Sequence, residues 1–159
     1  MGDGVFTIAL GQTVELYKRV KNNDPAGCLF RVTLWTGTIT DATLRDMDDI
    51  AEIEASTLAE SVATNYVRKS VTDTELAAVP SPDDANDRYE VDMPDQTWSS
   101  LGNGANSTLT RLIIAFDATG SDTDANMLPV TFYDFSLTTD GSDVIAQIDP
   151  NGFFRAAAA

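Results

Sequence analysis

The chain has no histidine and only one cysteine, Cys28. Histidine is the usual general base near neutral pH and the usual zinc ligand, so its absence weakens the case for an acid–base enzyme or a zinc protein. A single cysteine allows no internal disulfide and no thiolate metal cluster. As a nucleophile it would lack its usual histidine partner, so we expect Cys28 to be a buried apolar residue ahead of the run Leu29–Val32.

Recognised catalytic motifs are also missing. The sequence has no phosphate-binding loop, no GxSxG nucleophile elbow and no HExxH metalloprotease motif. Paired carboxylates could serve a glycosidase, but 25 acidic residues make such pairs common by chance. Anchoring in a core or an interface accounts for the two tryptophans, Trp35 and Trp98. We therefore expect a protein that is not an enzyme and needs no cofactor.

Basic residues are few: 10 lysines and arginines stand against 25 aspartates and glutamates, for a net charge of −15. Residues 1–24 are neutral, with three acids and three bases, whereas residues 37–95 hold 15 acids and four bases. This balance argues against binding to nucleic acid or to an anionic membrane surface, which both need clustered cations. Two readings remain open: the acidity serves solubility alone, or it belongs to an outward-facing shell component whose like charge limits aggregation of particles.

Long apolar runs are absent as well. No run approaches the length that spans a bilayer, and Val5–Leu10 is too short, and lacks the basic flank, for a signal peptide. We therefore expect a protein made in the cytoplasm. A hydrophobic fraction of 43% over 159 residues is enough for one folded domain with a real core.

Residues 5–22 have the spacing of an amphipathic helix, although Gly11 weakens it and Asn22–Pro25 ends it. Cations in the last turns suit the negative end of the helix dipole. Two interpretations stay open: the helix packs on its own domain, or residues 1–24 form an arm that docks on a neighbouring subunit beside a β-rich domain of residues 25–159. The candidate interface combines an apolar stripe with those cations: Phe6, Leu10, Val14, Tyr17, Lys18, Arg19 and Lys21.

The rest of the chain reads mainly as strands. Residues 42–54, capped by Thr40 or Asp41, and residues 73–78 predict short helices. Within 128–137, one face of the strand should bear Tyr133, Phe135 and Leu137. Loop 139–143 reads as a hairpin turn in which Gly141 takes positive φ. The predicted strands are 28–36, 62–71, 89–93, 109–116 (the most apolar and therefore central), 128–137 and 144–148.

Together these elements predict an α+β, mainly β fold: an antiparallel sandwich or barrel-like domain with one or two helices near the N-terminus.

Loop 117–126 is the most tempting metal site. Asp122, Asp124 and Asn126 place oxygen ligands at alternate positions, as calcium loops do. An EF-hand counted from Asp122 fails, because Met127 stands where glycine is required and Tyr133 where glutamate is required. The alternative is a loop whose acidic side chains satisfy nearby backbone groups. The same choice applies to the acidic stretch that holds Asp83, Asp84, Asn86 and Asp87.

Four segments carry a family likeness. The longest is the acidic, proline-bounded stretch Pro80–Trp98, and the others are Ala42–Asp46, Thr139–Asp143 and Gly152–Arg155. With them the chain resembles small structural proteins of tailed bacteriophages, many of them minor capsid proteins. The resemblance implies a non-enzymatic virion protein, and by analogy a capsid decoration protein on the outer surface of the head.

Such proteins are commonly β-rich, often trimeric, and bridge subunits of the major capsid protein. The resemblance therefore implies the major capsid protein as partner and a homo-oligomer, with a trimer favoured. Two alternatives remain: a tail, neck or head-completion component, and a calcium-dependent carbohydrate- or receptor-binding module.

Overall fold

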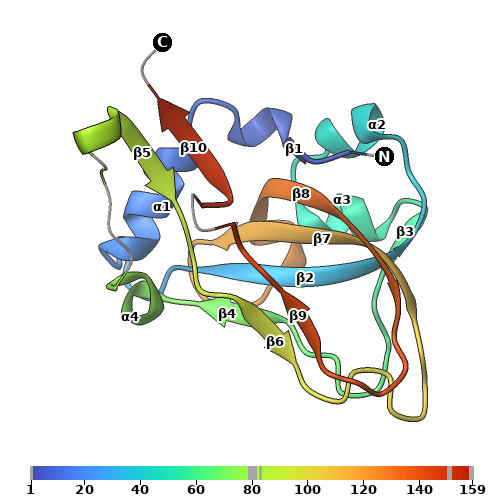
Figure 1. Ribbon diagram of the computed structural model, residues 1–159. Coiled ribbons are helices and arrows are strands. Elements are labelled where there is room, and N and C mark those ends of the chain that lie inside the picture. The colour runs from blue at the N-terminus through green and yellow to red at the C-terminus, as the bar shows by residue number, and fades with distance from the viewer. Residues whose placement is uncertain (1, 79–81, 83, 150–151, 158–159) are drawn as a thin grey trace.

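The computed structural model describes residues 2–78, 82, 84–149 and 152–157. Its main element is a six-stranded antiparallel sheet in the order β1–β8–β7–β2–β3, with β4 also paired to β2 (Figure 1). Two further pairs, β5 with β10 and β6 with β9, are antiparallel too. The predicted α+β, mainly β, antiparallel fold is therefore confirmed. The strands are β1 (Gly4–Val5), β2 (Leu29–Gly37), β3 (Leu58–Glu60), β4 (Lys69–Val71), β5 (Arg88–Val91), β6 (Gln96–Trp98), β7 (Thr108–Asp117), β8 (Met127–Thr138), β9 (Val144–Ala146) and β10 (Phe154–Ala157).

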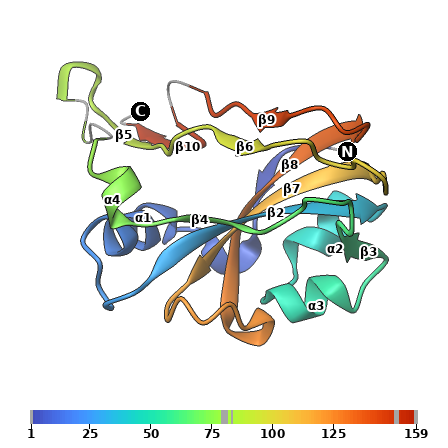
Figure 2. The same ribbon diagram turned by 90° about the horizontal axis from the view of Figure 1, so that it is seen from below.

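The helices are short and lie outside the sheet. The pair β6–β9 lies over one face of the large sheet, and α2 and α3 lie over the other (Figure 2). On the β6–β9 side, Tyr17 of α1 stacks on Phe30 of β2 with ring centroids 6.3 Å apart. The α-helices are α1 (Thr13–Lys21), α2 (Asp41–Arg45), α3 (Ile50–Glu54) and α4 (Asp73–Leu76), and the 3-10 helices are η1 (Thr7–Ala9), η2 (Asp84–Asn86) and η3 (Asp124–Asn126).

Strand β7 is the centre of the core, as its apolar sequence predicts. It pairs with β2 on one side and β8 on the other. Ile114 and Ile113, which point to opposite faces, are both 0% exposed. A strand buried on both faces needs a nearly continuous apolar run rather than alternation, and Leu112–Phe116 supplies it. Trp35, Trp98 and Cys28 are also buried, as expected.

The single helix predicted over residues 5–22 is wrong. Phe6 is extended and donates its backbone N–H to the Val130 carbonyl, so β1 and its continuation extend the sheet next to β8. Gly11 then takes φ +81°, which ends η1 before α1 begins. Packing of Phe6 against Phe132, with ring centroids 5.2 Å apart, therefore overrides the helical spacing.

The predicted helix 42–54 is two helices. Thr40 caps α2 as expected, and Asp49 caps α3 by accepting from the Glu52 N–H at 2.8 Å. Asp49 stops the first helix because a short acidic side chain is better used as an N-cap than in a helix interior. Leu44 and Ile53 are still buried on the predicted face.

Of the remaining predictions, one strand is shorter than expected, one helix is present and one hairpin is absent. The predicted strand 62–71 is shorter, since only β4 remains of it, and the helical turn at 73–78 is present as α4. The hairpin predicted across 139–143 is wrong: β9 pairs with β6, because the loop instead bonds to residues 100 and 101. Gly141 nevertheless has the expected positive φ, +92°. Residues 80, 81 and 83 of the acidic segment lie outside the described residues.

Candidate partner-binding site

The residues of the candidate N-terminal interface do not share one exposed face. Phe6 and Tyr17 are 0% exposed and belong to the chain's own core, whereas Leu10 is 61% exposed. The buried face of α1 is Thr13, Leu16, Tyr17 and Val20. Val14 and Lys21 are half-buried, and Lys18 and Arg19 are exposed, with Arg19 bonded to Glu15 at 3.3 Å. Residues 4–21 thus contribute to the core of the sheet, which favours the own-domain interpretation over a detached arm.

Loop 117–126 satisfies its own backbone. The buried Asp117 carboxylate accepts from the N–H groups of Gly120 and Asp122 at 2.8 and 3.0 Å, and Arg31 lies 3.3 Å from it. Burial by itself raises the pKa of Asp117, but the backbone donors and Arg31 outweigh it, so the pKa is lowered. Asp117 therefore stays ionised, and its carboxylate holds the loop through local hydrogen bonds.

Arg68 occupies the place where a cation would bind the predicted calcium residues. Its Nη1 lies 2.9 Å from Asp122 Oδ1 and 2.6 Å from Asp124 Oδ1, and its Nη2 contacts Glu60 at 2.5 Å. Asn126 ends η3 beside these residues. Within the described part of the chain, no group of three or more acidic or cysteine side chains is arranged to hold a metal ion. A guanidinium already neutralises these carboxylates, so calcium gains little by displacing it.

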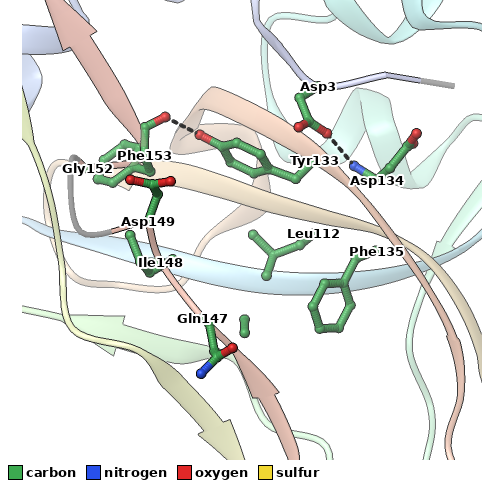
Figure 3. Close-up of a pocket in the computed structure, with 11 residues that line it drawn as sticks. Asp3, Leu112, Tyr133, Asp134, Phe135, Gln147, Ile148, Asp149, Gly152 and Phe153 are labelled. Carbon is green, nitrogen blue, oxygen red and sulfur yellow. Dashed lines mark hydrogen bonds between the residues drawn. The ribbon is translucent and has the colours of Figure 1, made fainter.

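A pocket of about 310 Å³ lies between β8 and residues 147–149, 152 and 153, which follow β9 in the chain (Figure 3). Leu112 forms its floor, and Phe135 and Ile148 face it from opposite sides. The carboxylates of Asp3 and Asp149 lie at its rim. The lining is mostly apolar with acidic ends: Asp3, Leu112, Tyr133, Asp134, Phe135, Ala146, Gln147, Ile148, Asp149, Gly152 and Phe153.

Hydrogen bonds fix the walls of this pocket. The Tyr133 hydroxyl donates to the Phe153 carbonyl at 2.5 Å, which ties β8 to the start of β10. Burial, aided by the nearby Asp3, raises the pKa of Tyr133 to about 12, so this donor keeps its proton throughout the physiological range. Asp3 Oδ1 accepts from the Asp134 N–H at 2.9 Å. The pocket is therefore a preformed cavity.

A buried arginine, Arg111, holds the pocket residue Asp134 in place. Arg111 of β7 is 0% exposed, and its Nη1 lies 2.6 Å from Asp134 Oδ1, while its Nη2 bonds to Asp41 of α2. Its Nη1 also donates to the Gly2 carbonyl at 2.8 Å. The guanidinium bond to Asp41 holds the pKa of that carboxyl below its usual range. Arg111 thus fixes the N-terminal residues and the edge of β8 together.

Sequence reasoning did not find this pocket. The half-buried face of Tyr133, Phe135 and Leu137 is as predicted, and it was the available signal. The opposite wall comes from residues 146–149, 152 and 153, and the sequence predicts that the strand over 144–148 returns along β8 after a hairpin. Because β9 pairs with β6 instead, that segment stands away from β8 and leaves the pocket open.

Comparisons with known proteins give no relative. No family model matches the chain, and neither the curated proteins nor the solved structures include a significant match. Among the described helices, none is long and apolar enough to cross a membrane.

Proposed function

We propose that this protein is a virion structural protein of a tailed bacteriophage, and specifically a capsid decoration, or minor capsid, protein on the outer surface of the head. It is made in the host cytoplasm, binds the major capsid protein and acts as a homo-oligomer, with a trimer favoured. It binds neither nucleic acid nor membrane and has no catalytic role.

The observation that carries the proposal is where the phage-like segments lie. Tyr89–Val91 falls in β5 and Phe154–Arg155 in β10, and these strands pair with each other. Thr139–Asp143 bonds to residues just after Trp98, for example Ser100 N–H to Asp143 Oδ1 at 2.8 Å. Parts of three of the four segments therefore lie in the strand pairs β5–β10 and β6–β9 or are bonded to residues that directly follow β6. A likeness concentrated around these strand pairs is what a shared binding role favours.

The distribution of charge supports the same proposal and indicates which element contacts the capsid. The chain carries a net charge of −15, yet Lys18, Arg19 and Lys21 gather in the last turns of α1, and the apolar Leu10 is exposed just before that helix. This is the least costly part of an acidic protein to bring against another surface. We expect the outer side of α1 to meet the capsid.

Co-sedimentation with undecorated heads tests the proposal. Full-length protein should pellet with the heads, and Lys18→Glu with Arg19→Glu should pellet about tenfold less, because two attractive charges become repulsive. The matched control places glutamate at four exposed alanines outside the phage-like segments, Ala55, Ala59, Ala105 and Ala125. It makes the same change in net charge elsewhere and should pellet like the unmodified protein. Deleting residues 1–24 is no substitute, because it removes Phe6 and Tyr17 from the core.

Absence of wild-type protein from the pellet would contradict the decoration role. The main alternative is a tail, neck or head-completion component, for which the protein would bind tails or connectors instead of heads. The calcium-dependent binding module is disfavoured, because Arg68 already occupies Asp122 and Asp124.

A further inference from the structure

The pocket beside β8 has the size and lining of a binding site for one long side chain. Its volume, about 310 Å³, is at the lower limit of ligand pockets, which run from about 300 to 1,000 Å³. Tyr133, Phe135, Ile148 and Phe153 are each only partly buried and line it. An apolar stem can therefore lie along these walls without displacing any core residue.

The charged side chains in the lining are all acidic: Asp3, Asp134 and Asp149. Asp134 is already paired with Arg111, which leaves Asp3 and Asp149 as the carboxylates nearest the opening, beside the neutral amide of Gln147. No lysine or arginine is among the described lining residues. The guanidinium of Arg111, which contacts the lining residue Asp134, is fully buried and is shared between Asp41 and Asp134. Arg45 lies over the Phe132 ring, outside the lining. A carboxylate or phosphate ligand would be repelled, whereas a cation would be attracted.

The outer edge of β8 is not suited to pairing with an added strand. β1 pairs with it at residues 131 and 132, and the Asp3 carboxylate accepts a hydrogen bond from the Asp134 N–H. A bulge lies between Asp134 and Leu137. Bulges and side-chain caps are devices that prevent strand addition. The pocket therefore fits a side chain from a surface segment better than an added strand.

We propose that this pocket binds a single arginine or lysine side chain that a partner protein presents between small apolar residues. The stem lies against Tyr133 and Phe135, where a cation also gains from the aromatic rings. The charged end reaches the carboxylates of Asp3 and Asp149. The net charge of −15 steers such a partner toward the molecule.

This inference holds for the isolated protein and does not depend on the virion proposal. The probe is the peptide acetyl-Gly-Val-Arg-Val-Gly-amide, added to the full-length ¹⁵N-labelled chain and followed by NMR. Amide shifts of Tyr133, Phe135 and Ile148 should move with the arginine peptide. They should stay in place with the twin peptide that carries glutamate in place of arginine.

Two variants measure separately how much the carboxylates and the apolar walls contribute to peptide binding. Asp3→Asn with Asp149→Asn should weaken the arginine peptide about tenfold, and Phe135→Ala should weaken it without a change of charge. The matched control, Asp48→Asn with Asp84→Asn, removes two exposed carboxylates elsewhere and should bind like the unmodified protein. The same spectra report whether each variant is folded.

Absence of pocket shifts at millimolar arginine peptide, equal response to the glutamate twin, or weakening by the control variant would each overturn the inference. Shifts that depend on protein concentration alone would show that a second copy fills the pocket, and would also overturn it. Peptide binding without binding to heads contradicts only the virion proposal, and head binding without peptide binding contradicts only this one.

Discussion

At the scale of single residues, the stability of this acidic protein depends on a few buried arginines. Arg111 is fully buried and joins β7 to Asp41 of α2 and Asp134 of β8. One cation thus holds three elements and the wall of the pocket. Its Nε has no hydrogen-bond partner among the described residues.

Replacing Arg111 tests this assignment. Arg111→Ala should cost about 2–5 kcal/mol, because it empties the space of a large, fully buried side chain. It also removes the bonds to Asp41 and Asp134. Arg111→Met, which keeps most of the side-chain volume, should cost less. Urea unfolding followed by circular dichroism measures both. A loss below about 1 kcal/mol for Arg111→Ala, typical of an exposed pair, would show that the guanidinium is not structural.

Asp117 makes a prediction about pH. Its folded-state pKa is lowered, so it contributes stability that is present above its unfolded pKa and is lost as pH falls through the folded value. Asp117→Asn should therefore be less stable than the unmodified protein at pH 7, and the difference should shrink below about pH 4, where unfolded aspartate protonates. Urea midpoints from pH 7 to pH 3 measure it, with Asp84→Asn as a control for charge alone. A constant difference across that range would contradict the assigned hydrogen bonds.

At the scale of elements, the local pattern predicted what is decided locally. The apolar run Leu112–Phe116 identified the central strand, and Thr40 identified the start of α2. One failure is local, since Asp49 caps α3 and so divides the helix predicted over 42–54. The others involve distant partners. Nothing near Phe6 in the sequence indicates that Val130 will accept its N–H, and nothing in 139–143 indicates that β9 will pair with β6. The pocket was missed for the same reason, since the position of its second wall follows from that pairing and from the bond between Tyr133 and Phe153.

Ile114 tests the central position of β7. It is 0% exposed and faces Val32 of β2 across the ladder. Ile114→Ala should cost about 2–5 kcal/mol, the usual range for truncation of a buried aliphatic side chain. A urea melt reports the change, and Ile145→Ala on the half-exposed β9 is the matched control that should cost far less. A cost below about 0.5 kcal/mol at Ile114, as at surface positions, would place β7 at the periphery.

At the scale of the whole molecule, charge is the dominant property. Most arginines of the core region are neutralised by acids, as Arg31 is by Asp117 and Arg68 by Glu60, Asp122 and Asp124. The remaining acidic excess lies largely on the surface, where it repels itself and keeps the protein dispersed. The two candidate contact surfaces differ in charge. The last turns of α1 carry cations that can meet an acidic partner, whereas the pocket carries carboxylates that can meet a cation.

Divalent ions distinguish a general effect of the acidic surface from a specific calcium-binding site. Calcium and magnesium at millimolar concentration should raise the melting temperature equally and slightly, because both only screen the acidic surface. Differential scanning calorimetry of the unmodified protein and of Asp122→Asn with Asp124→Asn measures this. A rise with calcium that magnesium does not produce, and that the double variant abolishes, would restore the binding-module alternative.

The most direct test of the virion role is a cryo-EM reconstruction of particles assembled with and without this protein. The proposal predicts extra density at regular positions on the outer surface of the head. That density should fit the six-stranded sheet, with α1 toward the capsid and the β5–β10 layer in a fixed orientation. Density confined to the neck or tail would contradict decoration and support the head-completion or tail alternative. Identical maps with and without the protein would contradict the virion role altogether.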